Sequence, residues 1–245
     1  MDTPPLSASQ LAELGAYDTP TVCNVIELFG ARPHTAGYMD GRVKSCFPRL
    51  DPMVGFAVTA TYRAAAPTDM VDPYKQVEAQ IRQFADLPGP AVVVIQDLDD
   101  PPVAATFGEM MCTAYKGFGA AGLITSGAGR DLLQVQALGF PVFTSGTICS
   151  HGYCCLADIG TPVRVGGIVV RPGDLLHGDA NGVTTIPLDI AGRVADACRE
   201  FVDTELPMLE YFKNTTSPTM EGYVEARDEG MRRARVLRER LRGGR

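Results

Sequence analysis

The strongest hydrophobic pattern in the chain is the unbroken run Ala91-Val92-Val93-Val94-Ile95, which ends in the polar pair Gln96-Asp97. A short apolar run that is rich in valine predicts a β-strand covered on both faces. A second β-rich run over residues 54–62 predicts a buried or half-buried strand. Shorter runs predict strands at 122–125 and 141–143.

Apolar residues at helical spacing alternate with these strands. They predict helices over 7–16, from 19 or 21 to 29, and over 74–84, 108–116 and 131–138, whereas residues 31–52 have no sustained period. Gly30 and the Pro88-Gly89-Pro90 turn are typical of helix ends. The alternation in the middle third predicts an α/β architecture with some parallel pairing.

The last third has a different pattern. Short β runs over 163–170, 175–183 and 184–187 are separated by turn residues, which predicts antiparallel hairpins packed against the α/β part. A long helix is expected over 189–212, bent or interrupted at Pro207, and another over 222–241. We expect one domain over 1–213, including the N-terminal helices, followed by a linker and an arginine-rich helix over 214–245.

Composition narrows the class of protein. Of the 245 residues, 45% are hydrophobic and 21% are charged, and the net charge of −7 argues against a general nucleic-acid surface. No apolar run approaches the roughly 18 residues that a membrane-spanning helix needs. The first ten residues lack the pattern of a signal peptide, so we expect a cytoplasmic protein whose seven cysteines are reduced thiols.

Three motifs have both a structural and a functional interpretation. Residues 117–122 match the dinucleotide fingerprint G-x-G-x-x-G, but they follow a predicted helix and open a strand, which favours a helix stop with close packing. Cys149, His151, Cys154 and Cys155 could suggest zinc, but adjacent cysteines rarely bind one tetrahedral ion. Buried thiols are favoured there, with His151 kept as a candidate pocket residue. The arginines of the last helix favour a solvated face, with oligomer contacts as the alternative.

The candidate active-site stretch runs from residue 108 to residue 131. A glycine-rich loop over 126–131 follows a predicted strand and ends in Arg130-Asp131, while Glu109 begins the preceding helix. Consecutive strand-to-helix connections converge on one crevice in α/β proteins, so these three side chains are expected to lie together. Two carboxylates with an arginine suit a divalent cation and an anionic substrate. The structural alternative is a carboxylate at a helix N-terminus beside a surface arginine.

These motifs together resemble the RraA-like family, which includes the class II 4-hydroxy-4-methyl-2-oxoglutarate/4-carboxy-4-hydroxy-2-oxoadipate aldolases. The resemblance covers roughly residues 17–210, and it is carried by Glu109 with Arg130-Asp131 and by segments at 18–26, 54–59, 140–143, 166–174 and 179–183. It implies an α-β-β-α sandwich of the swivelling-domain type with mixed parallel and antiparallel sheets. It also implies a trimer or hexamer with active sites between subunits.

The resemblance further implies a metal site. In the aldolases the aspartate after the arginine contacts Mg²⁺ or Mn²⁺, and Asp131 holds that position here. Glu109, which stands where the aldolases usually have aspartate, would act on the same ion through metal-bound water. A glutamate from the adjacent subunit's long helix completes the site; Glu205 is the best match and Glu200 the reserve.

The substrate side of the site is implied in the same way. Arg130 would bind the keto acid and stabilise its enolate, while Gly108 and the amides of Met110 and Met111 would hold the substrate carboxylate. The leading hypothesis is a divalent-metal-dependent lyase that acts on a 2-keto acid, by retro-aldol cleavage of a 4-hydroxy-2-keto acid, by oxaloacetate decarboxylation, or by both. The alternative is a non-catalytic RraA-type regulator that binds a ribonuclease or another protein. A nucleotide-dependent enzyme rests on the glycine fingerprint alone.

Overall fold

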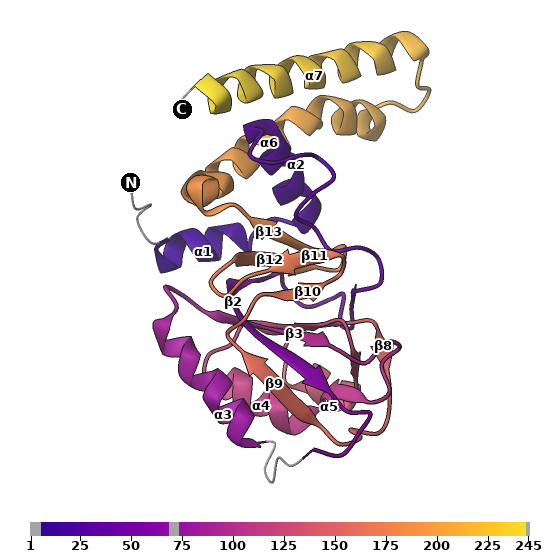
Figure 1. Cartoon of the computed structure of the whole chain (residues 1–245). Coiled ribbons are helices and arrows are strands. Elements are labelled where there is room, and N and C mark those ends of the chain that lie inside the picture. The colour runs from indigo at the N-terminus through magenta and orange to yellow at the C-terminus, as the bar shows by residue number, and fades with distance from the viewer. Residues whose placement is uncertain (1–5, 69–73, 244–245) are drawn as a thin grey trace.

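A mixed β-sheet lies between two layers of helices in the computed structural model, which describes residues 6–68 and 74–243 (Figure 1). This sheet has eight strands, of which β9 (Cys155–Ile159) pairs with β2 outside the main order. The main order is β1 (Lys44–Ser45), β7 (Val142–Thr144), β5 (Gly122–Thr125), β3 (Ala91–Asp97), β2 (Met53–Arg63), β12 (Leu175–Asp179) and β13 (Gly182–Ile186). The α/β sandwich with mixed parallel and antiparallel pairing is confirmed.

Strand β3 is the centre of the parallel part, with β2 and β5 as its parallel neighbours. Val93 and Ile95 belong to the core cluster on one face, and Val92 and Val94 belong to the cluster on the other. All four side chains are fully buried. The prediction of a strand covered on both faces is therefore confirmed, and its reason is the period of two along a pleated strand.

Helices cover both faces of the sheet in two layers. One layer holds α3 (Tyr74–Arg82), the short 3₁₀ helix η1 (Gln83–Asp86), α4 (Glu109–Gly117) and α5 (Leu132–Ala137). The other holds α1 (Ala8–Leu14), α2 (Thr19–Phe29), α6 (Leu188–Asn214) and α7 (Met220–Gly243). Ser7 caps α1, and Gly30 ends α2 as expected, in a left-handed conformation. Of the two effects expected of Pro207, an interruption does not occur, because α6 continues through it as one helix, and a bend stays a prediction.

A second, three-stranded sheet was not predicted from the sequence. It contains β4 (Ala105–Phe107), β6 (Ala128–Gly129) and β8 (Gly146–Thr147), all parallel. Strands of two or three residues are too short to show a hydrophobic period, so no pattern marked them. The predicted antiparallel hairpins are present as β10 (Val163–Val165) with β11 (Ile168–Val170) and as β12 with β13.

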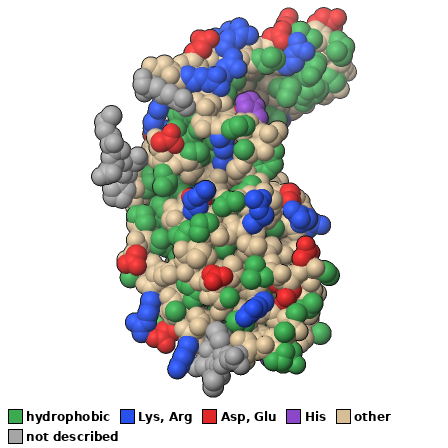
Figure 2. Space-filling model, viewed as in Figure 1, with side chains coloured by type: hydrophobic (Ala, Val, Ile, Leu, Met, Phe, Trp, Pro, Cys, Tyr) green, Lys and Arg blue, Asp and Glu red, His purple; other side chains and the backbone are tan. Residues whose placement is uncertain are grey.

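The glycine fingerprint and the arginine-rich last helix have structural roles. Gly117 ends α4, and a Cβ atom on Gly122 would lie 2.7 Å from the Pro141 carbonyl and closer still to the Met53 sulfur, so a helix stop and close packing are found at these two glycines as favoured. Helix α7 packs along α6, and its Arg232 and Arg233 pair with Glu229 on the same helix. Figure 2 shows basic and acidic side chains interspersed over this helical part of the surface, as favoured for a solvated face. The predictions about a signal peptide and about the arginines of the last helix partly concern residues 1–5 and Arg245. These residues lie outside the described part of the chain. Within the part described, no helix is long and apolar enough to cross a bilayer.

A buried histidine ties the helical layer to the sheet and should make stability depend on pH. His177 on β12 accepts a hydrogen bond at Nδ1 from the Thr19 hydroxyl (2.9 Å) and donates one from Nε2 to the Leu14 carbonyl (3.1 Å). Burial lowers its pKa from 6.5. The unfolded chain therefore binds more protons just below pH 6.5, and the stability due to neutral His177 is lost as pH falls through that range.

We expect the free energy of unfolding of His177→Gln to depend less on pH between about 7 and 5 than that of the wild type. Chemical denaturation at each pH measures this slope. His34→Gln is the matched control, since the His34 side chain is 67% exposed. Asp97, whose pKa burial raises to about 6, titrates in the same range with the opposite sign. The wild-type curve alone is therefore uninformative, and equal slopes for wild type and His177→Gln would contradict the prediction.

Candidate functional site

The parallel pairing of β4 with β6 brings the two candidate loops together. Phe107 at the end of β4 pairs with Gly129 at the end of β6. One residue further on, the Arg130 backbone N–H donates to the Phe107 carbonyl at 3.1 Å. Gly108 and the start of α4 therefore lie beside Arg130 and Asp131, so the expected convergence of the two strand-to-helix connections is confirmed.

Asp131 is the one non-glycine residue in the described chain with a positive φ, at 54°. A left-handed conformation costs energy for a residue with a Cβ atom and is often found at functional sites. The side chain does not cap its own helix, α5, but accepts the Glu109 backbone N–H of α4 at 3.1 Å through Oδ2. The Arg130 Nε atom lies 3.9 Å from the same oxygen. In the described part of the chain, Oδ1 has no hydrogen-bond partner.

Gly108 gives this cluster the room it needs. A Cβ atom at Gly108 would lie 2.7 Å from Oδ2 of Asp131 and 3.1 Å from Nε of Arg130. The backbone at Gly108 is extended, with φ −152° and ψ −172°, so its conformation alone would accept other residues. The reason for glycine here is therefore space and not backbone freedom.

The first turn of α4 presents backbone N–H groups to the same place. The first N–H groups of a helix have no acceptor within it, and they carry the positive end of the helix dipole. Asp131 accepts the N–H of Glu109, and the amides of Met110 and Met111 follow in the same turn. The arrangement can bind an anion next to the Arg130 guanidinium.

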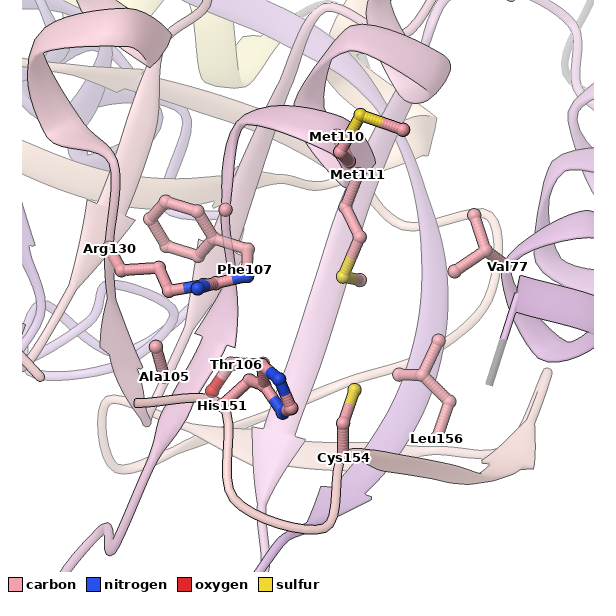
Figure 3. A pocket seen from close by; sticks show the side chains of 11 residues that line it. Val77, Ala105, Thr106, Phe107, Met110, Met111, Arg130, His151, Cys154 and Leu156 are labelled. Carbon is pink, nitrogen blue, oxygen red and sulfur yellow. The ribbon is translucent and has the colours of Figure 1, made fainter. Parts of the chain in front are cut away.

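A pocket of about 280 Å³ opens beside these groups (Figure 3). Arg130 lies on one side of it, and Val77 from α3 and Leu156 from β9 lie on the other. Gly108, Met110, Met111 and Arg130, which were expected to contact substrate, all line the pocket. Val77, Thr106, Phe107 and Leu156 were not singled out as site residues. The short run at 104–107 was the available signal for Thr106 and Phe107, and no motif marks Val77 or Leu156.

His151 lines the same pocket, as the sequence suggested. Its loop is held by the Ala105 N–H, which donates to the Ser150 carbonyl at 2.7 Å, and by the Tyr62 hydroxyl, which lies 3.2 Å from the His151 carbonyl. The ring Nδ1 lies 2.8 Å from the Gly152 carbonyl and must donate to it. In the neutral ring, Nε2 is then left as an acceptor.

The thiols near His151 differ from one another. Cys155 is buried, and burial raises the pKa of the partly buried Cys154 thiol, as favoured for this turn. Cys149 is exposed, so the expectation of a buried thiol is wrong there. Cys149 follows the edge strand β8 in a surface loop, and no core residue covers it.

The carboxylates proposed from the sequence are not all at the pocket. The Glu109 side chain is exposed and is not among the residues that line the pocket. Glu205 is exposed on α6, in the helical layer on the opposite side of the sheet. Glu200, the reserve, pairs with Arg240 on α7. A role for Glu205 beside Arg130 thus requires a second copy of the chain, as the resemblance implied, and stays a prediction.

A comparison with protein-family models identifies the family of the chain. The model of the RraA-like family (Aldolase/RraA) matches residues 19–185. The chain belongs to the RraA-like family. The matched range contains α4, Arg130, Asp131 and the pocket described above.

Two curated relatives show modest similarity. A protein of Halalkalibacterium halodurans named "Putative 4-hydroxy-4-methyl-2-oxoglutarate aldolase" is 38% identical over 99 residues, which is 40% of this chain and 47% of the relative. An uncharacterized protein of Methanocaldococcus jannaschii is 29% identical over 107 residues, 43% of this chain and 51% of the relative. The chain thus spans about half the length of these two relatives.

Two solved structures show the same fold. An uncharacterized protein from Pseudomonas syringae superposes with a TM-score of 0.71 at 22% identity, over 93% of this chain and 97% of that one. Streptomyces coelicolor RraAS2, described as an unusual member of the RNase ES inhibitor RraA protein family, gives 0.64 at 22% identity, over 88% and 99%. These likenesses concern the fold.

The space at Gly108 yields a direct test of the cluster. Gly108→Ala should displace the Asp131 and Arg130 side chains and weaken the binding of a small carboxylate at Arg130 and the α4 amides by about tenfold or more, because small displacements in a positioned site are costly. Titration calorimetry with pyruvate as the probe measures the affinity. Gly117→Ala, at the other end of α4, is the matched control, since a Cβ atom there meets nothing within 4 Å. Equal affinities for the two variants would show that the cluster does not depend on this space.

Proposed function

We propose that the protein is a divalent-metal-dependent lyase that acts on a 2-keto acid and releases pyruvate. Either retro-aldol cleavage of a 4-hydroxy-2-keto acid or decarboxylation of oxaloacetate fits this site, because both pass through a pyruvate enolate. The observation that carries the proposal is the cluster at α4: Arg130 and the first turn of α4 line the pocket, and the Asp131 carboxylate lies directly behind them, beside the Arg130 guanidinium and on the Glu109 N–H.

The residues present fit a hydrated divalent ion. Among the described residues, no three carboxylate, imidazole or thiol side chains lie close enough together to hold one metal. Mg²⁺, however, is usually bound through only one or two carboxylates and keeps several waters. Asp131 would hold the ion through Oδ1, while Oδ2 stays on the Glu109 N–H. When bound, such an ion would act as a Lewis acid toward the keto oxygen.

The chain's own groups have separable roles. Arg130 pairs with the substrate's anionic end and stabilises negative charge where it develops. The amides of Met110 and Met111 hold the substrate carboxylate at the positive end of α4. Glu109, the exposed first residue of α4, carries the proton transfer through a water, because its side chain does not itself line the pocket. We further propose a trimer or hexamer in which Glu205 of a neighbouring copy completes the site.

Asp131→Ala should abolish Mg²⁺-dependent pyruvate release from oxaloacetate, because it removes the one carboxylate that the cluster positions. A coupled pyruvate assay measures this, with the protein-free rate in Mg²⁺ subtracted at each concentration. Asp51→Ala is the control, since Asp51 is an exposed carboxylate away from α4. Turnover by Asp131→Ala equal to that of the wild type would contradict the metal role.

A non-catalytic RraA-type regulator is the alternative. Capture from lysate on the wild-type protein and on Asp131→Ala separates the two proposals. A regulator should retain the same partner in both, with no pyruvate release from a panel of 4-hydroxy-2-keto acids and oxaloacetate. Metal-dependent pyruvate release that Asp131→Ala loses would exclude the purely regulatory role.

A further inference from the structure

The wall of the pocket opposite Arg130 is apolar. It is formed by Val77, Met111 and Leu156, with Cys154 beside Leu156, whereas Ala105 and Phe107 lie on the Arg130 side (Figure 3). Val77, Met111 and Leu156 are buried members of the core cluster under α3 and α4, so the wall is part of the core surface. Figure 3 shows the Met111 side chain in the middle of the pocket, between Arg130 on one side and Val77 and Leu156 on the other.

Positive charge is present at one end of the pocket only. Arg130 is the single charged side chain among the lining residues. The other polar groups are Thr106, whose hydroxyl accepts from Thr125 at 3.3 Å, His151, whose Nδ1 bonds the Gly152 carbonyl, and the thiol of Cys154. Arg130 and the α4 amides can together hold one carboxylate. A second carboxylate that reached Val77 and Leu156 would meet no cation among the described lining residues, and only the weak thiol donor of Cys154, so its burial would be unfavourable.

We propose that this site takes 2-keto acids with one carboxylate, at the keto end, and an apolar substituent at the far end. The proposal rests on the lyase function above and specifies its substrate class. The keto-acid head lies at Arg130, and the apolar substituent packs on Val77, Met111 and Leu156. The flexible thioether of Met111 lets the wall adjust to substituents of different shape.

The reaction with such a substrate is a balanced retro-aldol cleavage. The C3–C4 bond breaks, and its electron pair stays on C3 as the enolate of pyruvate. The 4-hydroxyl loses its proton as C4 becomes an aldehyde carrying the apolar substituent. C3 takes up a proton to give the methyl group of pyruvate, so the step needs no oxidant or reductant.

A matched pair of substrates tests the proposal on the unmodified protein. 4-Hydroxy-5-methyl-2-oxohexanoate carries an isopropyl group where 4-hydroxy-2-oxoglutarate carries its distal carboxylate, so the two differ in charge but little in size. With Mg²⁺ present, we expect kcat/KM for pyruvate release to be at least about tenfold higher for the isopropyl compound. Equal values, or a preference for the dicarboxylate, would overturn the proposal.

A binding measurement separates this proposal from the lyase function. 5-Methyl-2-oxohexanoate and 2-oxoglutarate are the same pair without the 4-hydroxyl, so neither can undergo the cleavage. Titration calorimetry should give at least about tenfold tighter binding of the apolar compound. If neither hydroxy acid releases pyruvate, the lyase function fails, and this arm alone decides the pocket's preference. Tighter binding of 2-oxoglutarate overturns the inference whatever the activity.

A charge placed in the wall should reverse the preference. Met111→Lys supplies a second cation opposite Arg130 without altering the backbone amide, and we expect the ratio of the two affinities to shift toward 2-oxoglutarate by tenfold or more. Met231→Lys is the matched control, because Met231 is 58% exposed on α7. Thermal unfolding establishes that both variants fold. A folded Met111→Lys protein with the wild-type ratio would contradict the proposed position of the substituent.

Discussion

One backbone hydrogen bond, from Arg130 N–H to the Phe107 carbonyl, determines where the candidate site can exist. It extends the parallel pairing of β4 and β6 by one residue, just where each strand gives way to a helix. Residues 108 and 130 therefore become neighbours although they are distant in sequence. The main sheet does not itself bring residues 108 and 130 together, because its strands β3 and β5 are followed by loops that lead to β4 and β6 of the small sheet. The small sheet therefore positions the residues of the site, and the large sheet positions the small one.

The electrostatics of the cluster follow from that placement. Three sources of positive or negative charge meet within a few residues: the N-terminus of α4, the Asp131 carboxylate and the Arg130 guanidinium. The side chains of Arg130 and Asp131 are 37% and 34% exposed, so solvent weakens their mutual attraction at 3.9 Å. The energy cost of the left-handed backbone conformation of Asp131 is offset in part by the hydrogen bond that its side chain accepts from the Glu109 N–H. The same bond orients Oδ2 inward and leaves Oδ1 for a ligand.

Sequence patterns predicted the large elements well and the small sheet not at all. β3 and the helices from α1 to α7 are long enough to show a period, and Gly30 and Gly117 marked helix ends correctly. The Glu109 and Arg130-Asp131 motifs were placed together because strand-to-helix connections converge in α/β proteins. The pocket wall could not be predicted, since Val77 and Leu156 come from α3 and β9, and only the tertiary fold brings them to Arg130. Apolar residues at helical or strand spacing carry no mark that separates a pocket wall from a core.

That distinction between wall and core is also weak in the folded protein. Val77, Phe107, Met111 and Leu156 pack with the buried face of β2 and β3 in one cluster, and they also face the pocket. A change in their size would alter both the stability of the layer under α3 and α4 and the shape offered to a ligand. The charged cluster, by contrast, rests on backbone pairing and on the space at Gly108. The reactive end of the site and its apolar end are therefore held by different physical forces, so the apolar end can change with core packing while the Arg130 and Asp131 geometry is retained.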